Sequence, residues 1–143
     1  METLRNKEGF ICDMDGVIYH GNRLLPGVKE FVNWLTENKK NFLFLTNSSQ
    51  YTPRELQNKL ARMGLDVDET HFYTSALATA CFLDTQSPGC SAYVVGEHGI
   101  LNALYDKGII MMWIRIMWWW VNPPVIIWSR LRRQFVWSMP EPN

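Results

Sequence analysis

Residues 10–17, Phe-Ile-Cys-Asp-Met-Asp-Gly-Val, constrain this chain most, because an apolar run leads directly into two aspartates and a glycine. Residues two apart on an extended backbone point to the same side, so Asp13 and Asp15 are expected to face one site at the end of a buried strand. Two carboxylates suit a divalent cation such as Mg2+, which prefers oxygen ligands. With one carboxylate ionised and the other moving a proton, the pair fits nucleophilic and acid–base chemistry.

Strand-like and helix-like segments alternate after this stretch. A hairpin or a flap beside the site is expected over residues 17–25. The next helix has an apolar stripe at Val28, Phe31, Val32 and Leu35. A later helix is expected to start with a capping box of Thr52 and Glu55. Strands are predicted over 9–12, 42–45, 71–74 and 92–95, with further helices over 75–83 and 100–107. This order predicts an α/β fold with a Rossmann-like parallel sheet.

Polar side chains follow the strand predicted over residues 42–45. They are Thr46, Asn47 and two serines. Ligands of parallel α/β sheets bind at the carboxyl ends of the strands, where Asp13, Asp15 and Thr46 are all expected. An Asp-x-Asp pair by itself also fits a solvated turn with an Asx hydrogen bond. An EF-hand loop is excluded because apolar residues follow where further oxygen ligands would be needed.

Five motifs occur in a specific order over residues 9–108. They are Ile-Cys-Asp-Met-Asp-Gly-Val at 11–17, Pro-Gly at 26–27, Leu-Thr-Asn-Ser at 45–48, Phe-Tyr-Thr-Ser-Ala at 72–76 and Tyr-Val-Val-Gly-Glu at 93–97. Together they resemble the haloacid dehalogenase-like phosphatases, and most closely the NagD-like branch (subclass IIA) with an α/β cap. The resemblance implies a first half of the phosphatase core over 1–78 and the start of a cap over 79–109.

The resemblance also implies the role of each site residue. Asp13 is expected to form an aspartyl-phosphate, and Asp15 to protonate the leaving oxygen and then activate water. Mg2+ would bind the Asp13 carboxylate and the backbone carbonyl of Asp15. Thr46, Asn47 and Gly16 would bind the substrate phosphate. The implied substrate is a small phosphorylated metabolite such as a nucleoside monophosphate.

The chain departs from this family after residue 109. The family would supply a lysine and further acidic metal ligands there, but this chain has no Asp after Asp106, no Lys after Lys107, and only Glu141 as a later acid. We therefore expect a truncated, inactive form of the enzyme. Half a core is also expected to leave sheet edges and helix faces uncovered.

The segment 110–143 contains six of the seven tryptophans but no glycine. Arg115 and Pro123-Pro124 interrupt it, so it is too short for a spanning helix of about 20 apolar residues. One interpretation of the segment is an interfacial membrane anchor. A translation in the wrong reading frame explains it better. Met and Trp each have a single codon, so the DNA of this stretch can be inferred and read in another frame. Shifted by one base, Met111 to Val121 reads as an Asp-Val-Asp start and a Val-Val-Val-Gly end. The family leads one to expect such a cap strand here.

Composition excludes some classes of protein. Lys plus Arg and Asp plus Glu balance at 14 each, which argues against a nucleic-acid binder. Three cysteines without metal-like spacing indicate a reduced, cytoplasmic chain, and the polar N-terminus lacks the apolar core of a signal peptide. The oligomeric state cannot be read. The alternative to an enzyme is a non-catalytic interaction or membrane-peripheral protein that uses the Trp-rich tail.

Overall fold

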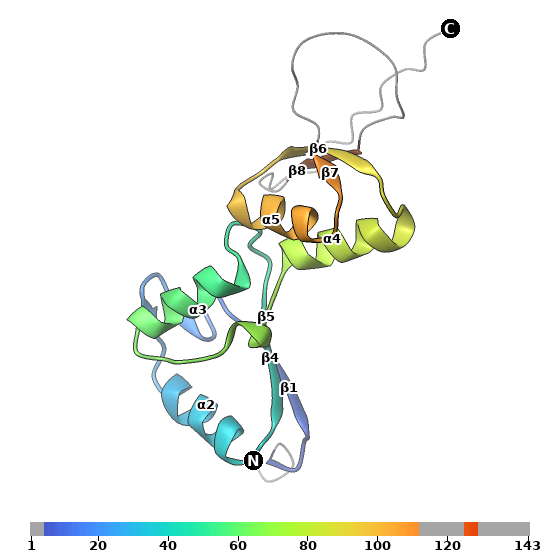
Figure 1. The fold of residues 1–143 in the computed structure, drawn as a ribbon. Coiled ribbons are helices and arrows are strands. Elements are labelled where there is room, and N and C mark those ends of the chain that lie inside the picture. The colour runs from blue at the N-terminus through green and yellow to red at the C-terminus, as the bar shows by residue number, and fades with distance from the viewer. Residues whose placement is uncertain (1–4, 112–124, 129–143) are drawn as a thin grey trace, which may run out of the picture.

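The computed structural model describes residues 5–111 and 125–128 (Figure 1). The described elements are, in chain order, β1 (Gly9–Asp13), β2 (Tyr19–His20), β3 (Arg23–Leu24), α2 (Val28–Glu37), β4 (Asn41–Thr46), α3 (Pro53–Arg62), η1 (Glu69–His71), β5 (Phe72–Thr74), α4 (Ser75–Gln86), β6 (Ser91–Val95), α5 (His98–Asp106), β7 (Ile110–Met111) and β8 (Val125–Trp128). The α/β class and the hairpin expected over 17–25, now β2 and β3, are confirmed.

The first sheet has the strand order β1-β4-β5, and all of its strands run parallel. Its covered face packs against α2 and α3, which Figure 1 shows on one side of the sheet. Phe44 of β4 and its neighbour Phe72 of β5 are buried there beside Val32 of α2 and Leu56 of α3. The carboxyl ends of the three strands therefore meet at one end of the sheet, near Asp13.

Local sequence signals define α2 and α3 as expected. In α2, Val28, Val32 and Leu35 of the predicted stripe are buried. In α3, the Glu55 amide donates to the Thr52 hydroxyl at 3.2 Å, and the Thr52 amide donates to the Glu55 carboxylate at 2.8 Å. This reciprocal capping box satisfies two amides at the start of the helix that would otherwise lack partners.

A second parallel sheet follows, with the order β7-β6-β8. Helices α4 and α5 pack together beneath it around buried residues that include Ala80, Ala92 and Leu104. The start of α5 lies directly on the loop after β4. The Gly99 amide donates to the Gln50 carbonyl at 3.0 Å, and a Cβ on Gly99 would lie only 2.6 Å from the Ser49 carbonyl oxygen. Glycine is therefore required for this close approach.

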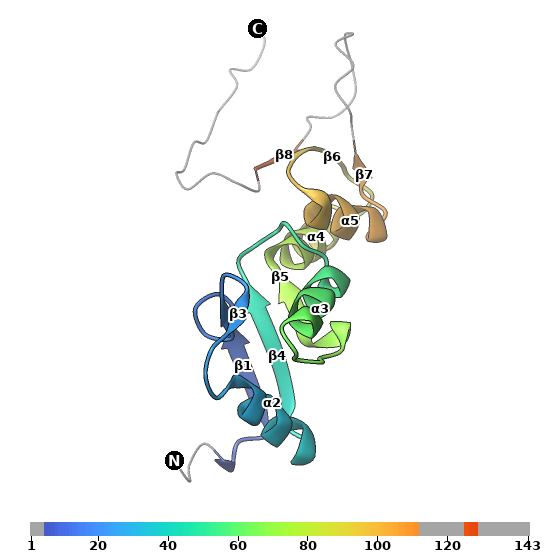
Figure 2. The ribbon, with the colours of Figure 1, turned by 90° about the vertical axis from the view of Figure 1, so that its left-hand side faces the viewer.

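The prediction that β1 is a buried strand is wrong within the described part of the chain. Ile11 is 71% exposed, and its strand neighbours Phe10 and Cys12 are only partly buried. The physical reason is that β1 lies at the edge of the first sheet as described (Figure 2), and Figure 1 shows described helices on one face of that sheet only. Apolar residues on both faces of a strand indicate burial only when both faces of its sheet are covered. In the described part of the chain, one face of this sheet is covered.

The proposed limit between residues 78 and 79 lies inside α4, which is continuous there. All three buried residues of α4, Ala76, Ala80 and Leu83, pack in the second cluster. In the segment 110–143, strands β7 and β8 are described and pair with β6, one on each side. Residues 112–124 and 129–143 lie outside the described residues. The tryptophan-rich stretch 113–120, on which the membrane-peripheral alternative rests, is among the latter.

Candidate active site

The turn after β1 positions the two aspartates. Met14 lies between them with no exposed surface, and its carbonyl accepts hydrogen bonds from three successive amides, those of residues 17–19, at 3.3, 2.9 and 3.2 Å. Gly16 has a φ of 82°, in the left-handed region that favours glycine. A buried anchor and a tight turn thus hold Asp13 and Asp15 at the carboxyl end of β1.

Asp13 is the last residue of β1, and its carboxylate is accessible to solvent. Its Oδ1 accepts a hydrogen bond from the Met14 amide at 2.9 Å. This hydrogen bond restricts the rotamer of the Asp13 side chain and uses only one of its two carboxylate oxygens.

The structure brings Asp15 and Thr46 together from neighbouring strands. The Thr46 hydroxyl, in a side chain that is only 6% exposed, donates to Asp15 Oδ2 at 3.5 Å. The hydroxyl oxygen of Thr46 also accepts a hydrogen bond from the Ser48 amide at 3.1 Å. The parallel pairing of β1 with β4, which sets Asp13 opposite Leu45, makes this contact possible.

Asn47 and Gly16 are placed less directly for binding phosphate. Asn47 is exposed at the end of β4, and its backbone carbonyl accepts from the Ser75 hydroxyl at 2.9 Å. The Gly16 amide donates to the Tyr19 carbonyl at 2.8 Å, so it is already hydrogen bonded. A phosphate contact from the Gly16 amide would require that bond to break. The backbone conformation of Gly16 supports a role in forming the turn after β1.

Sequence reasoning missed Tyr19 and Lys59. Tyr19 is 4% exposed, and burial raises the pKa of its hydroxyl, as do the charge of Asp15 and hydrogen bonding to it. The Lys59 Nζ of α3 lies 4.1 Å from the centre of the Tyr19 ring and 5.4 Å from that of Tyr51. No local pattern could have linked them, because β2, α3 and the turn after β1 meet only in the folded chain.

The donor set is compatible with Mg2+, which is commonly bound by one or two carboxylates and completes its shell with water and substrate phosphate. Asp13 offers an accessible carboxylate. The β-bridge between Asp15 and Tyr19 consists of two hydrogen bonds: the Gly16 amide donates to the Tyr19 carbonyl, and the Tyr19 amide donates to the Met14 carbonyl. The Asp15 carbonyl takes part in neither of them. Among the described residues no cluster of three or more His, Cys, Asp or Glu side chains surrounds a possible metal.

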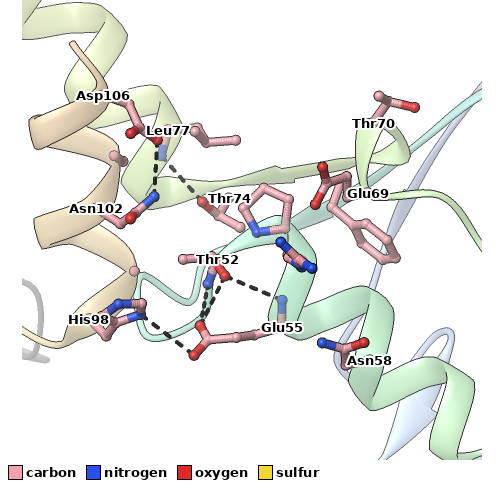
Figure 3. A pocket seen from close by; sticks show the side chains of 15 residues that line it. Thr52, Glu55, Asn58, Glu69, Thr70, Thr74, Leu77, His98, Asn102 and Asp106 are labelled. Atoms are coloured by element: carbon pink, nitrogen blue, oxygen red, sulfur yellow. Dashed lines mark hydrogen bonds and ion pairs between the residues drawn. The ribbon is translucent and has the colours of Figure 1, made fainter.

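A cavity of about 790 Å3 lies elsewhere, between α3 and α5 (Figure 3). None of the five predicted site residues lines it. Two pairs of its polar side chains contact each other: Glu55 lies 3.5 Å from His98, and Asn102 donates to Asp106 at 3.0 Å. We therefore assign this cavity to the gap between α3 and the helices that pack beneath the second sheet, apart from the candidate site at the end of β1.

Comparison with known proteins decides the family. The profile of the haloacid dehalogenase-like hydrolases matches residues 10–110. The chain belongs to this family. The match begins in β1 and ends in β7, so it includes the first sheet, strand β6 of the second sheet and every residue of the candidate site, but not β8. The resemblance inferred from the motifs is thereby confirmed for the N-terminal part of the chain.

Relatives support the NagD-like branch. The chain is 43% identical over 102 residues to dihydroxyacetone phosphatase of Corynebacterium glutamicum, covering 71% of this chain and 37% of the relative. It is 39% identical over 137 residues to ribonucleotide monophosphatase NagD of Escherichia coli, covering 96% and 50%. The second alignment therefore extends into the segment after residue 110.

Solved structures agree with these relatives. NagD from E. coli aligns with a TM-score of 0.70 and 41% identity, over 73% of this chain and 42% of that one. The 4-nitrophenylphosphatase of Thermotoga maritima aligns with a TM-score of 0.69 and 34% identity, over 75% and 41%. The chain thus spans about half the length, or less, of the proteins it matches. In the described residues, no helix is both long and apolar enough to cross a membrane.

Proposed function

We propose that this chain carries the nucleophile half of a Mg2+-dependent phosphomonoester hydrolase site. The observation that carries the proposal is the contact of the Thr46 hydroxyl with Asp15 Oδ2, at the carboxyl ends of the paired strands that also hold Asp13. It groups a potential nucleophile, a proton carrier and a hydroxyl donor at one end of a parallel sheet. Phosphoryl transfer depends mainly on such positioning and on stabilising charge.

The proposed reaction has two steps. Asp13 attacks phosphorus, the ester P–O bond breaks, and Asp15 gives its proton to the leaving oxygen. Asp15 then removes a proton from water, which attacks the aspartyl-phosphate and releases inorganic phosphate with Asp13 restored. The Thr46 hydroxyl, and the exposed Asn47, would hydrogen bond the phosphoryl oxygens. Mg2+, held by the Asp13 carboxylate and the Asp15 carbonyl, would stabilise the negative charge on those oxygens when bound.

The names of the relatives support a proposal for the substrate class. Proteins similar to this chain are named ribonucleotide monophosphatase, dihydroxyacetone phosphatase and acid sugar phosphatase. Each of these names describes removal of phosphate from a small phosphorylated compound. We therefore propose a small phosphomonoester, such as a nucleoside monophosphate, as substrate. The free state of Cys12, Cys81 and Cys90 is consistent with the proposed cytoplasmic location.

The reading frame after residue 110 is the first matter to test. We predict that the coding DNA, shifted by one base near codon 110, encodes a continuous NagD-like cap strand ending in Val-Val-Val-Gly. The check is to sequence the gene and its transcript. A DNA sequence whose shifted frame is closed by stop codons would contradict the prediction. Strand β8 and the long NagD alignment would then reflect a genuine, divergent cap.

A second prediction concerns Thr46 in the frame-restored protein, meaning the product of the gene with that shift corrected. Thr46→Val is expected to lower kcat by about 30-fold to 1,000-fold, because one lost transition-state hydrogen bond costs roughly 2–4 kcal/mol. Thr46→Ser, which keeps the hydroxyl, is the matched control. The rates are measured as phosphate released from nucleoside monophosphates. Full activity of Thr46→Val combined with a lower melting temperature would instead assign Thr46 a structural role.

A further inference from the structure

The loop after β4, residues 47–51, connects the candidate site to the start of α5. It follows Thr46 directly, and Figures 1 and 2 both show it reaching α5. A Cβ on Gly99 of α5 would lie 2.6 Å from the Ser49 carbonyl oxygen and 2.8 Å from that of Tyr51. These distances are too short for a side chain, so the loop and α5 fit together only because residue 99 is glycine.

Three hydrogen bonds link the start of α5 to the Thr46 hydroxyl. The Gly99 amide donates to the Gln50 carbonyl at 3.0 Å. The Gln50 amide donates to the Ser48 hydroxyl at 3.3 Å, and the Ser48 amide donates to the Thr46 hydroxyl at 3.1 Å. We call Gly99, Gln50 and Ser48 the relay. The relay connects a helix beneath the second sheet to a buried side chain of the candidate site.

The relay sets the direction in which Thr46 donates its hydrogen bond. A hydroxyl has one hydrogen to donate and lone pairs that accept. Because the Ser48 amide occupies one side of the Thr46 oxygen, the hydroxyl hydrogen points away from it, toward Asp15 Oδ2 at 3.5 Å. Thr46 is only 6% exposed, which limits competition from water.

The loop and α5 are each anchored on either side of their contact. Tyr51, at the end of the loop, packs against the core of the first sheet. Ile100, next to Gly99, is buried in the second cluster. At the start of the loop, the Asn47 carbonyl accepts from the Ser75 hydroxyl of α4 at 2.9 Å. The position of α5 therefore determines the shape of the loop.

We propose that Gly99 and Ser48 are positioning residues for the proposed phosphatase reaction, and that they orient the Thr46 hydroxyl through the loop 47–51. The inference rests on the proposed function, in which this hydroxyl hydrogen bonds the phosphoryl oxygens. Both residues act through Thr46. Small displacements matter, because misplacing a group by about 1 Å can lower a rate about 100-fold.

The test uses variants of the frame-restored protein, assayed for Mg2+-dependent phosphate release from nucleoside monophosphates. Gly99→Ala is expected to lower kcat about tenfold to 100-fold and to change KM less than about twofold, because the Thr46 hydroxyl acts in the transition state. Gly9→Ala is the matched control and should leave kcat unchanged. A Cβ on Gly9 would lie 3.8 Å from the Asn41 carbonyl oxygen, an ordinary contact at the other end of the first sheet.

Ser48→Ala is a second variant, which keeps the proposal testable if Gly99→Ala disturbs the fold. It removes the acceptor of the Gln50 amide without adding bulk, and kcat should fall about threefold to tenfold. Ser48→Thr keeps a hydroxyl and should restore the activity. Circular dichroism and the melting temperature of each variant check the fold.

Each variant is then combined with Thr46→Val. A residue that acts only through Thr46 should cause no further loss once that hydroxyl is removed, whereas independent structural effects multiply. Multiplied losses would overturn the inference and leave the proposed function intact. So would an unchanged kcat in both Gly99→Ala and Ser48→Ala.

Failure of the proposed function would give a different result. Unmodified frame-restored protein would then show no Mg2+-dependent turnover, or turnover that survives Asp13→Asn. The relay is in that case tested without turnover, by the exchange rate of the Ser48 amide hydrogen in nuclear magnetic resonance spectra. Gly99→Ala should speed this exchange about tenfold or more, because the loop opens more readily. An unchanged exchange rate would reject the relay whatever the reaction.

Discussion

Replacing Asp13 with asparagine is expected to abolish Mg2+-dependent release of phosphate by the frame-restored protein. The amide cannot form the acyl-phosphate, so the rate should fall by at least about 10^4-fold, as expected for the loss of a covalent nucleophile. The fold should survive, because Asp13 is exposed at the end of β1. The asparagine Oδ1 can still accept the hydrogen bond that the Met14 amide donates in this structure.

Asp66→Asn is the matched control, because Asp66 is also an exposed carboxylate but lies in the loop after α3. It should leave turnover unchanged. Phosphate release is followed with and without Mg2+, and circular dichroism monitors the fold. Near-normal turnover by Asp13→Asn protein would remove Asp13 from the role of nucleophile. Asp15 would then be the carboxylate to examine next.

The sequence predicted most of the fold because the signals for its elements are local. Apolar spacing identified α2, and the Thr52–Glu55 pair identified the start of α3, both of which the structure bears out. Alternation of strands and helices was enough for the α/β class. These features depend on residues within one or two turns of each other, so they need no knowledge of what packs against them.

Burial and long-range contacts were harder to predict. The apolar character of β1 indicated two covered faces, whereas Ile11 is largely exposed in the described structure. The position of Lys59 over the Tyr19 ring depends on the packing of α3 against the turn after β1. Such contacts join distant segments, and no spacing within either segment encodes them.

The candidate site was predictable in part. The order of the motifs placed Asp13, Asp15 and Thr46 at strand ends, and the structure joins the last two through a 3.5 Å contact. The roles assigned to these residues remain proposals. The engagement of the Gly16 amide by Tyr19 was not foreseeable, because it depends on the geometry of one turn.

The 143-residue polypeptide by itself is expected to show no Mg2+-stimulated phosphatase activity. Beyond Lys107 it has no lysine, and beyond Asp106 its only acidic residue is Glu141. Mg2+ at Asp13 and Asp15 would therefore have few protein ligands, and no further ammonium group would offset the charge of the phosphate. Catalysis by electrostatic stabilisation requires such charges to be in place before the reaction.

The isolated polypeptide should also be poorly soluble, because the apolar side chains of Ile11 and Tyr73 on the first sheet are in contact with water. The measurements are phosphate release from nucleoside monophosphates with and without Mg2+, and size-exclusion chromatography of the same sample. Frame-restored protein, prepared in parallel, is the positive control for the assay. A soluble monomer with Mg2+-dependent turnover that Asp13→Asn removes would contradict this prediction. The missing charges would then have to come from residues 112–143, where arginine is the only basic residue type.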